Sequence, residues 1–310
     1  MKLSDVTGIG VKDLGTRVNF VTTLPSLLVA IGVLLLVWSG APSNPPDAAR
    51  AVDELKGLNA TEVGLLILAL ICLVLVTHPL QLALVRLLEG YGAPKSPLAP
   101  VRWLLLRYHR YRWDKLNGAA NDQGATDSDR LAAETRLWHD YPNRDALLPT
   151  RLGNVLRAAE IRAGARYGID AIVAWPRLLP LVSADLRAAL DDQRNQLDIA
   201  CRFCVTLFAG AVITAGLLVT QGPWLALALI PLGLSLTSYQ SAVAAARAYG
   251  ESIKAAFDLH RFALLAQMHL PLPADRNAEI AANEKLYLFL RQGVPDNLIY
   301  EHPENTPPAS

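Results

Sequence analysis

Hydrophobic positions follow one another without interruption in the middle of the chain. From Phe203 to Ala246 the sequence contains no Asp, Glu, Lys or Arg, and Gln221-Gly222-Pro223 breaks this apolar run near its centre. An apolar helix of about 20 residues crosses the hydrocarbon layer of a membrane, and there the backbone must satisfy its own hydrogen bonds. The pattern therefore predicts a transmembrane helical hairpin, with one span at 203–220 and the next at 223–245.

Two further apolar runs precede this hairpin, within residues 18–90. Phe20 to Trp38 predicts a first span, and Trp38 lies where an aromatic side chain suits the membrane interface. Val63 to Val85 predicts a second span, separated from the first by a polar external loop at 40–61. The expected fold is therefore an all-α integral membrane protein with four transmembrane helices.

Both arms of the hairpin are expected to continue beyond the apolar run, over residues 184–268. In the first arm, apolar side chains recur at near-heptad, coiled-coil spacing: Leu186, Leu190, Leu197, Cys201, Cys204 and Phe208. In the second arm, charges follow in steps of four and three, which predicts one solvated stripe: Arg247, Glu251, Lys254, Asp258 and Arg261. Nearly 20 residues of each helix then form a stalk about 30 Å long. In this stalk, Leu190 should face Ile253, and Leu186 should face Phe257.

Basic residues follow the second span and indicate the orientation. Between Arg86 and Lys115 there are seven Lys or Arg residues and two acidic residues, whereas the turn at 221–223 has no charge. Because Lys and Arg concentrate in cytoplasmic loops, the distribution predicts a multi-pass protein of the plasma (inner) membrane with both termini in the cytoplasm. The three cysteines do not form a disulfide framework, and a reducing compartment is compatible with this.

The regions outside the spans divide into four predicted parts. These are a cytoplasmic N-terminus at 1–17, a cytoplasmic helical domain at 91–183, a C-terminal helix at 269–300 and a disordered tail at 301–310. The stalk at 184–268 should extend into the same compartment as the domain.

Three local patterns organise the predicted helical domain. Helical periodicity covers Asp129 to His139, and Thr150 is expected to cap a further helix that Gly168 closes. Ala171 to Val182 is apolar but too short and too interrupted by proline to cross a membrane. Such a segment is typical of a core helix or an interfacial element.

Composition agrees with membrane residence. Of 310 residues, 52% are hydrophobic and 18% are charged, which is too apolar for an average soluble domain. The net charge of +1 gives no global attraction to nucleic acid. The expected partners are the lipid bilayer and further copies of the chain, and no cofactor is expected.

Cations and aromatic residues alternate just after the second span. Aromatic rings suit the depth of lipid headgroups, and each Lys or Arg near an anionic leaflet contributes about 1 kcal/mol. The segment therefore predicts binding to an anionic membrane surface; packing within the helical domain and nucleic-acid binding are the alternatives. The residues concerned are Arg102, Trp103, Arg107, Arg110, Arg112, Trp113 and Lys115.

Four arginines decorate the helix after Thr150. They are Arg151, Arg157, Arg162 and Arg166. A solvated helix face accounts for them, and binding of an anion or a phosphate-bearing ligand near the helix start is the alternative.

Cys201 and Cys204 form a C-x-x-C pair on a predicted helix. His78 lies at a similar depth on the second span, so a Cys/Cys/His metal cluster is one interpretation. Two small core side chains is the simpler one, since no second ligand pair is present. His78, beside Pro79, either has a functional role or bonds a carbonyl that proline leaves unpaired.

These patterns leave three hypotheses for function. The first is a non-enzymatic membrane sensor, scaffold or effector, in which events at the cytoplasmic helices pass along the stalk to the transmembrane bundle. The second is an oligomeric pore, in which small residues at Gly210 and Thr214, and at Ala211 and Ala215, allow close helix approach between subunits. A polar path would run along Thr206, Thr214, Ser235, Thr237 and Gln240. The third is a membrane enzyme that acts on a lipid-linked substrate through Arg151, Arg157 and His139.

Overall fold

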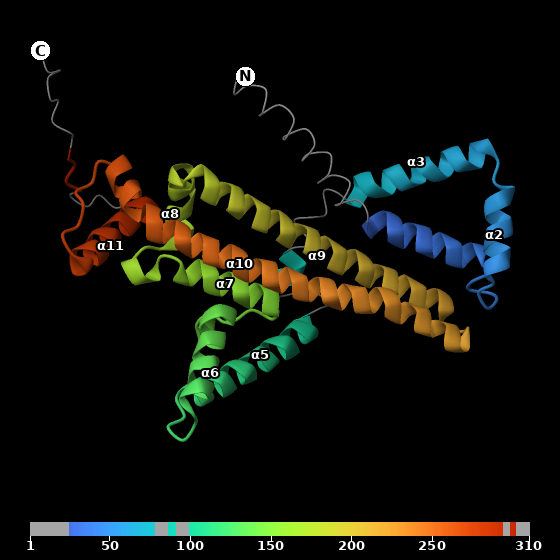
Figure 1. Ribbon diagram of the computed structural model, residues 1–310, viewed down its shortest axis with the longest axis horizontal. Coiled ribbons are helices and arrows are strands. Elements are labelled where there is room, and N and C mark those ends of the chain that lie inside the picture. The colour runs from blue at the N-terminus through green and yellow to red at the C-terminus, as the bar shows by residue number, and fades with distance from the viewer. Residues whose placement is uncertain (1–24, 78–85, 91–98, 294–297, 302–310) are drawn as a thin grey trace, which may run out of the picture. The chain divides into compact units, whose positions relative to one another are not determined.

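The protein is all-helical in a computed structural model that describes residues 25–77, 86–90, 99–293 and 298–301 (Figure 1). Side chains at 73–77 are not described. The chain divides into two compact units. The first unit comprises Met1–Leu88 and Gln196–Ala242, and the second comprises Glu89–Asn195 and Val243–Ser310. Each unit is considered by itself.

Two helices in the described part of the chain are long and apolar enough to cross a membrane. They are α9, Ala184–Leu218, and the helical stretch Gly222–Gln267, which comprises the 3₁₀ helix η5, Gly222–Ala228, and α10, Leu229–Gln267. They contain residues 203–218 of the predicted span at 203–220 and all of the predicted span at 223–245. These two spans support a membrane protein.

The other two predicted spans are not established. The described helix Pro25–Trp38 is shorter than a span, and residues 20–24 lie outside the described residues. The second apolar run begins in α3, Ala60–Thr77. It counts as a candidate span only when joined to α2, Ala48–Gly57, from which it is bent by 109°. The predicted loop at 40–61 thus contains a helix that the sequence analysis did not identify.

The predicted turn between the two long helices is confirmed. Gln221 precedes η5, and Gly222 has a positive φ of 59°, a conformation that glycine adopts readily. Pro223 follows in the first turn of η5, where its missing N–H costs no hydrogen bond. The second arm therefore begins with seven residues of 3₁₀ helix before α10 starts.

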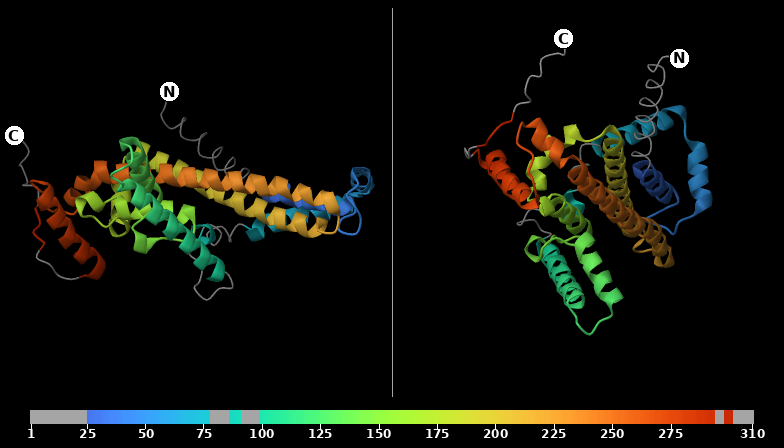
Figure 2. Two further views of the ribbon diagram at one scale, coloured as in Figure 1. Left: turned by 90° about the horizontal axis from the view of Figure 1, so that it is seen from below. Right: turned by 60° about the vertical axis from the view of Figure 1, so that its left-hand side comes forward.

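The second unit contains most of the shorter helices. Figure 2 shows α5 and α6 side by side as a hairpin joined by a short loop. The elements of this unit, apart from its parts of α9 and α10, are α5 (Ala99–Ala120), α6 (Asp127–Asp140), η2 (Arg144–Ala146), α7 (Arg151–Arg162), η3 (Ala165–Tyr167), α8 (Ala171–Leu178), η4 (Leu179–Leu181) and α11 (Arg276–Gln292).

In the second unit, capping residues determine where several helices begin or end. The Oγ1 atom of Thr150 accepts a hydrogen bond from the Gly153 amide at 3.0 Å, as the sequence predicted. Gly168 has a φ of 71° and closes η3 rather than α7, which ends earlier at Arg162. Asp170 caps α8 by accepting bonds from two backbone amides. These caps set where α7 and α8 begin, and both helices contribute to the sites described below.

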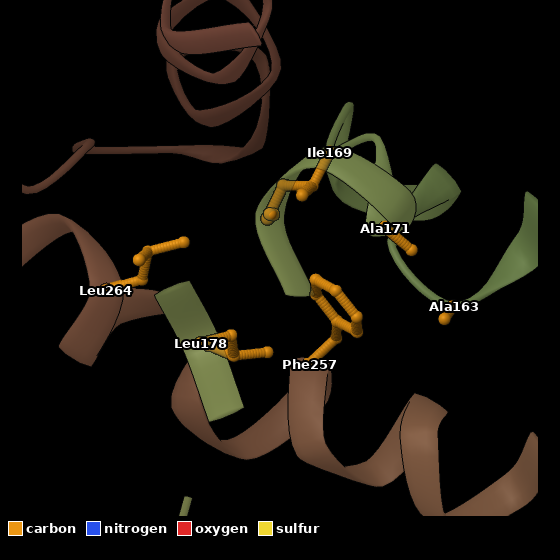
Figure 3. Close-up of a cluster of buried hydrophobic side chains, with 7 residues drawn as sticks. Ala163, Ile169, Ala171, Leu178, Phe257 and Leu264 are labelled. Atoms are coloured by element: carbon orange, nitrogen blue, oxygen red, sulfur yellow. The ribbon is translucent and has the colours of Figure 1, made fainter. Parts of the chain in front are cut away.

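The predicted pairing of the two long helices holds for Leu190. Leu190 is buried with Ala256, and Ile253 packs against the same cluster. Leu186 also packs against this cluster, whereas Phe257 belongs to a different one. Phe257 is fully buried among α8 residues such as Leu178 (Figure 3). Its ring centroid lies 6.0 Å from that of Trp175. The apolar face of α8 thus contributes to the burial of Phe257 through Ala171, Ala174 and Leu178.

Close backbone approach fixes α7 against its neighbours. A side-chain carbon added at Gly153 would lie 2.1 Å from the Glu89 carbonyl oxygen, and one added at Gly250 would lie 2.7 Å from the Ala159 methyl group. Neither glycine can be enlarged without displacing backbone or a buried methyl group. Hence α7 crosses α10 at Gly250, in direct contact.

Candidate functional site

The charged residues of α10 make polar contacts with three other elements of the second unit. We call Arg247, Glu251, Lys254, Asp258 and Arg261 the α10 charge row. Groups from α6, η3 and α11 pair with it, so the predicted stripe is only partly solvated: the Glu251 side chain is 52% exposed and that of Arg261 is 19% exposed. The pairs are Arg247 with Asp140, Glu251 with His139 and Lys254, Asp258 with Tyr167, and Arg261 with Glu279.

Asp140 is the most buried carboxylate in this set after Glu279. Arg247 donates to both of its oxygens at 2.7 Å, and Arg151 of α7 lies 3.4 Å from Oδ2. Its side chain is 11% exposed. A planar guanidinium that binds both carboxylate oxygens fixes orientation as well as charge. Asp140 thus joins the end of α6 to α7 and α10.

His109 lies on the buried face of α5 and contacts Tyr141, the residue that follows Asp140. Its Nδ1 atom is 3.3 Å from the Tyr141 hydroxyl, and the residue is 5% exposed. Burial, with smaller contributions from Arg112 and Arg151, lowers the pKa of His109 from 6.5 to about 4. The imidazole is therefore neutral at neutral pH.

Two cationic side chains, Arg162 and Lys254, lie near the carboxyl end of α6. Arg162 donates to the carbonyl oxygens of Leu137, at 2.9 Å, and of Trp138. Its guanidinium lies 4.6 Å from the centroid of the Trp138 ring, and the Lys254 ammonium lies 5.9 Å from it. Positive charge at the carboxyl end of a helix is favourable, because the last carbonyl groups have no partner within the helix.

Arg261, the last residue of the α10 charge row, binds α11. Arg261 donates to Glu279, which is 5% exposed, at 2.8 Å and lies over the Tyr167 ring at 4.2 Å. The Tyr167 hydroxyl donates to Asp258 at 2.7 Å, and Asn283 donates to the Tyr167 carbonyl at 2.8 Å. One helix therefore anchors α6 at one end of its charge row and η3 and α11 at the other.

The predicted membrane-binding residues lie on α5. Arg107 stacks on the exposed Trp103, Arg112 bonds to the Tyr108 hydroxyl, and Arg110 and Lys115 are exposed. The remaining two are half-buried: Arg102 and Trp113. The indole of Trp113 donates to the Pro142 carbonyl at 3.2 Å, so it attaches α5 to the end of α6.

The four arginines of the predicted anion site have different partners. Arg151 approaches Asp140, Arg157 bonds Glu160 at 3.2 Å, and Arg162 caps α6. Arg166 is exposed. The anion-binding interpretation stays a prediction.

The remaining candidates lie in the first unit. Cys201 and Cys204 are buried, and the Ser235 hydroxyl donates to the Cys204 carbonyl at 2.8 Å. His78 lies outside the described residues, within which no cluster of three metal-ligating side chains occurs. Among the residues assigned to a pore, Thr214 and Ser235 are buried, and Gly210 lies against Val29 of the same chain.

Asp140, His109 and Glu279 were missed by sequence reasoning. Each is a single polar residue on a helix. Its side-chain partner lies 18 to 107 positions away in the sequence. Local spacing carries no signal for such partners.

Substitution of Asp140 by Asn should loosen the attachment of α6. It leaves Arg247 and Arg151 without their carboxylate, so we expect the opening free energy of α6 to fall by about 2 kcal/mol, less than for a fully buried pair. Hydrogen exchange of the α6 amides measures this. As a control, Asp127→Asn removes an exposed pair with Arg130 and should change it by less than about 0.5 kcal/mol. Equal effects of both substitutions would contradict the assignment.

The buried His109 should make the protein less stable in acid. Between pH 6.5 and 4 the unfolded state binds a proton that folded His109 does not, so stability is lost as pH falls through this range. The full loss is about 3 kcal/mol at 1.36 kcal/mol per pKa unit. In His109→Phe this part of the pH dependence of thermal unfolding should disappear. An identical pH dependence in both proteins would show that the pKa of His109 is the same in the folded and unfolded states, which would contradict the lowered pKa.

Comparison with known proteins does not indicate a function for the chain. No protein-family model matches the chain, and neither a curated protein nor a solved structure is similar to it. The geometry shows one long helix whose charge row binds groups from three separate elements. Such an arrangement can hold several elements in a fixed relation to one helix.

Proposed function

We propose that the protein is a non-enzymatic membrane sensor, scaffold or effector in which α10 transmits changes in the second unit to the apolar hairpin. The α10 charge row carries the proposal. Because it pairs with α6, η3 and α11, a displacement of any of these elements acts on α10.

The burial of the carboxylates in these ion pairs favours transmission through α10 over a row of charges that only water contacts. Asp140 and Glu279 have side chains that are 11% and 7% exposed, and removing one partner from such a pair leaves an uncompensated charge. The elements cannot shift without either moving α10 or losing these bonds. Helix α10 continues without a break into residues of the first unit, as does α9.

We further propose that α5 binds an anionic membrane surface. Its buried side follows helical spacing at Leu106, His109, Trp113 and Leu116. Its opposite side exposes large apolar and aromatic side chains between cations: Val101, Trp103, Leu104, Tyr108 and Tyr111. The single acidic residue of α5, Asp114, is bound by Arg144 at 2.8 and 3.1 Å, so it does not oppose the positive face. Rings and cations on one exposed side fit the headgroup region of an anionic leaflet.

The pore hypothesis has weaker support. Two of its polar residues, Thr214 and Ser235, are buried within the chain, and Thr237 bonds the carbonyl of Leu234. Gly210, which was to allow approach of another subunit, has Val29 beside it.

A disulfide reporter in the hairpin tests transmission. The Cys204 sulfur lies 3.7 Å from the Ser235 hydroxyl, so Ser235→Cys creates an oxidisable pair once Cys72 and Cys201 are replaced by alanine. In native membranes, Asp140→Asn should change the oxidation rate of this pair severalfold, since α10 loses its contact with α6. Asp127→Asn is the matched control and should leave the rate unchanged. If Asp140→Asn and Asp127→Asn both oxidise at the parental rate, α10 does not couple the second unit to the hairpin.

A spin label on α5 tests lipid binding. At Leu104→Cys, 61% exposed in the native residue, the label should become more accessible to oxygen in nanodiscs with anionic lipid than in zwitterionic ones. The same label at Leu131→Cys on α6, 64% exposed natively, is the control and should not respond. Replacing Arg107 and Arg110 by Gln should remove the response at 104. Insensitivity of position 104 to lipid charge would refute the proposal.

A further inference from the structure

A cavity of about 220 Å³ lies in the second unit, between α7, α8 and α10. The side chains that line it are mostly apolar, and two of them, Trp175 and Tyr249, are aromatic. The lining residues are Leu156, Ala159, Glu160, Ala171, Ile172, Trp175, Pro176, Tyr249 and Ile253. The close contact of Gly250 with Ala159 keeps α7 and α10 together beside it. Ile172 and Pro176 in its lining are exposed, so the cavity is accessible from solvent.

A second hollow of about 340 Å³ adjoins the cavity and shares Glu160, Ala171 and Ile172 with it. This hollow is acidic. It is lined by Glu160, Asp170 and Glu284 against one cation, Arg157. Glu160 is the charged residue common to both spaces, so a ligand in the apolar cavity meets a carboxylate at the boundary with the acidic hollow.

We propose that these two spaces form a binding site for a small amphiphilic cation. The apolar part of the ligand occupies the cavity beside Trp175 and Tyr249, and its ammonium group binds Glu160. The proposal concerns binding alone and does not depend on the function proposed above, because every lining residue belongs to the second unit.

Size and charge support this class of ligand. An apolar cavity of about 150 Å³ is known to hold benzene, so about 220 Å³ admits a ring or a chain of about six carbons. Aromatic faces attract cations, and the acidic hollow repels anions.

The ion pair of Glu160 with Arg157 leaves room for a second cation. Arg157 donates to Oε2 at 3.2 Å, and the two side chains are 33% and 43% exposed. A pair exposed to this degree contributes little stability, and a carboxylate has about four acceptor positions. An ammonium group can therefore bind Glu160 without first breaking a strong interaction.

Calorimetry on the full chain in nanodiscs tests the site, with empty nanodiscs titrated as the blank. The probes are hexylammonium, hexanol and hexanesulfonate, which share one chain and differ in charge. Hexylammonium should bind at least tenfold more tightly than hexanesulfonate. In Glu160→Gln this preference should vanish, whereas the matched substitution Glu134→Gln, at an exposed site on α6, should retain it.

Two cavity-filling variants locate the apolar part. Leu156→Trp should weaken hexylammonium binding at least tenfold, and Ile172→Trp, at a side chain that is 54% exposed, provides the same test with less risk to folding. Equal affinity for all three probes would overturn the cation preference. Unchanged affinity in both tryptophan variants, or no binding of hexylammonium to the native chain, would overturn the site.

Discussion

The ion pair between Arg247 and Asp140 lies where α10 changes from uncharged to charged residues. Arg247 is the first charged residue after 44 uncharged positions, and both of its bonds to Asp140 are 2.7 Å long. A helix that is apolar in one half and charged in the other needs partners for each half. The second unit supplies them for the charged half, through α6, η3 and α11. The positions of these three elements therefore depend on α10, and so does the proposed transmission.

The long helices could be predicted from the sequence because their signals are local. The uncharged run, the Gln221-Gly222-Pro223 break and the cap at Thr150 each depend on neighbouring residues, and all three agree with the structure. The contact of Leu190 with the Ile253 cluster followed from counting back from the turn. Two predicted spans did not follow in the same way. The first described helix is too short, and the second is bent against α2.

The polar interactions could not be predicted, because their partners are far apart in sequence. A charge every three or four residues has the same pattern whether water or another helix covers it. Only the fold brings Asp140 within 2.7 Å of Arg247, 107 positions later, and Tyr167 within 2.7 Å of Asp258, 91 positions later. The cavity at Trp175 has the same origin, since its walls come from α7, α8 and α10, and α7 meets α10 at Gly250. The membrane-binding and anion-binding candidates chosen from the sequence were therefore sets of residues close together in the chain.

The central claim is that α9 and α10 cross the membrane as a hairpin, so that the turn at Gly222 and the end of the chain lie on opposite sides. Labelling of single cysteines with a membrane-impermeant maleimide, in a protein without native cysteines, tests this directly. In intact cells Gly222→Cys should react and Glu301→Cys should not, and in inverted vesicles the order should reverse. Reaction of both positions from the same side would contradict the account.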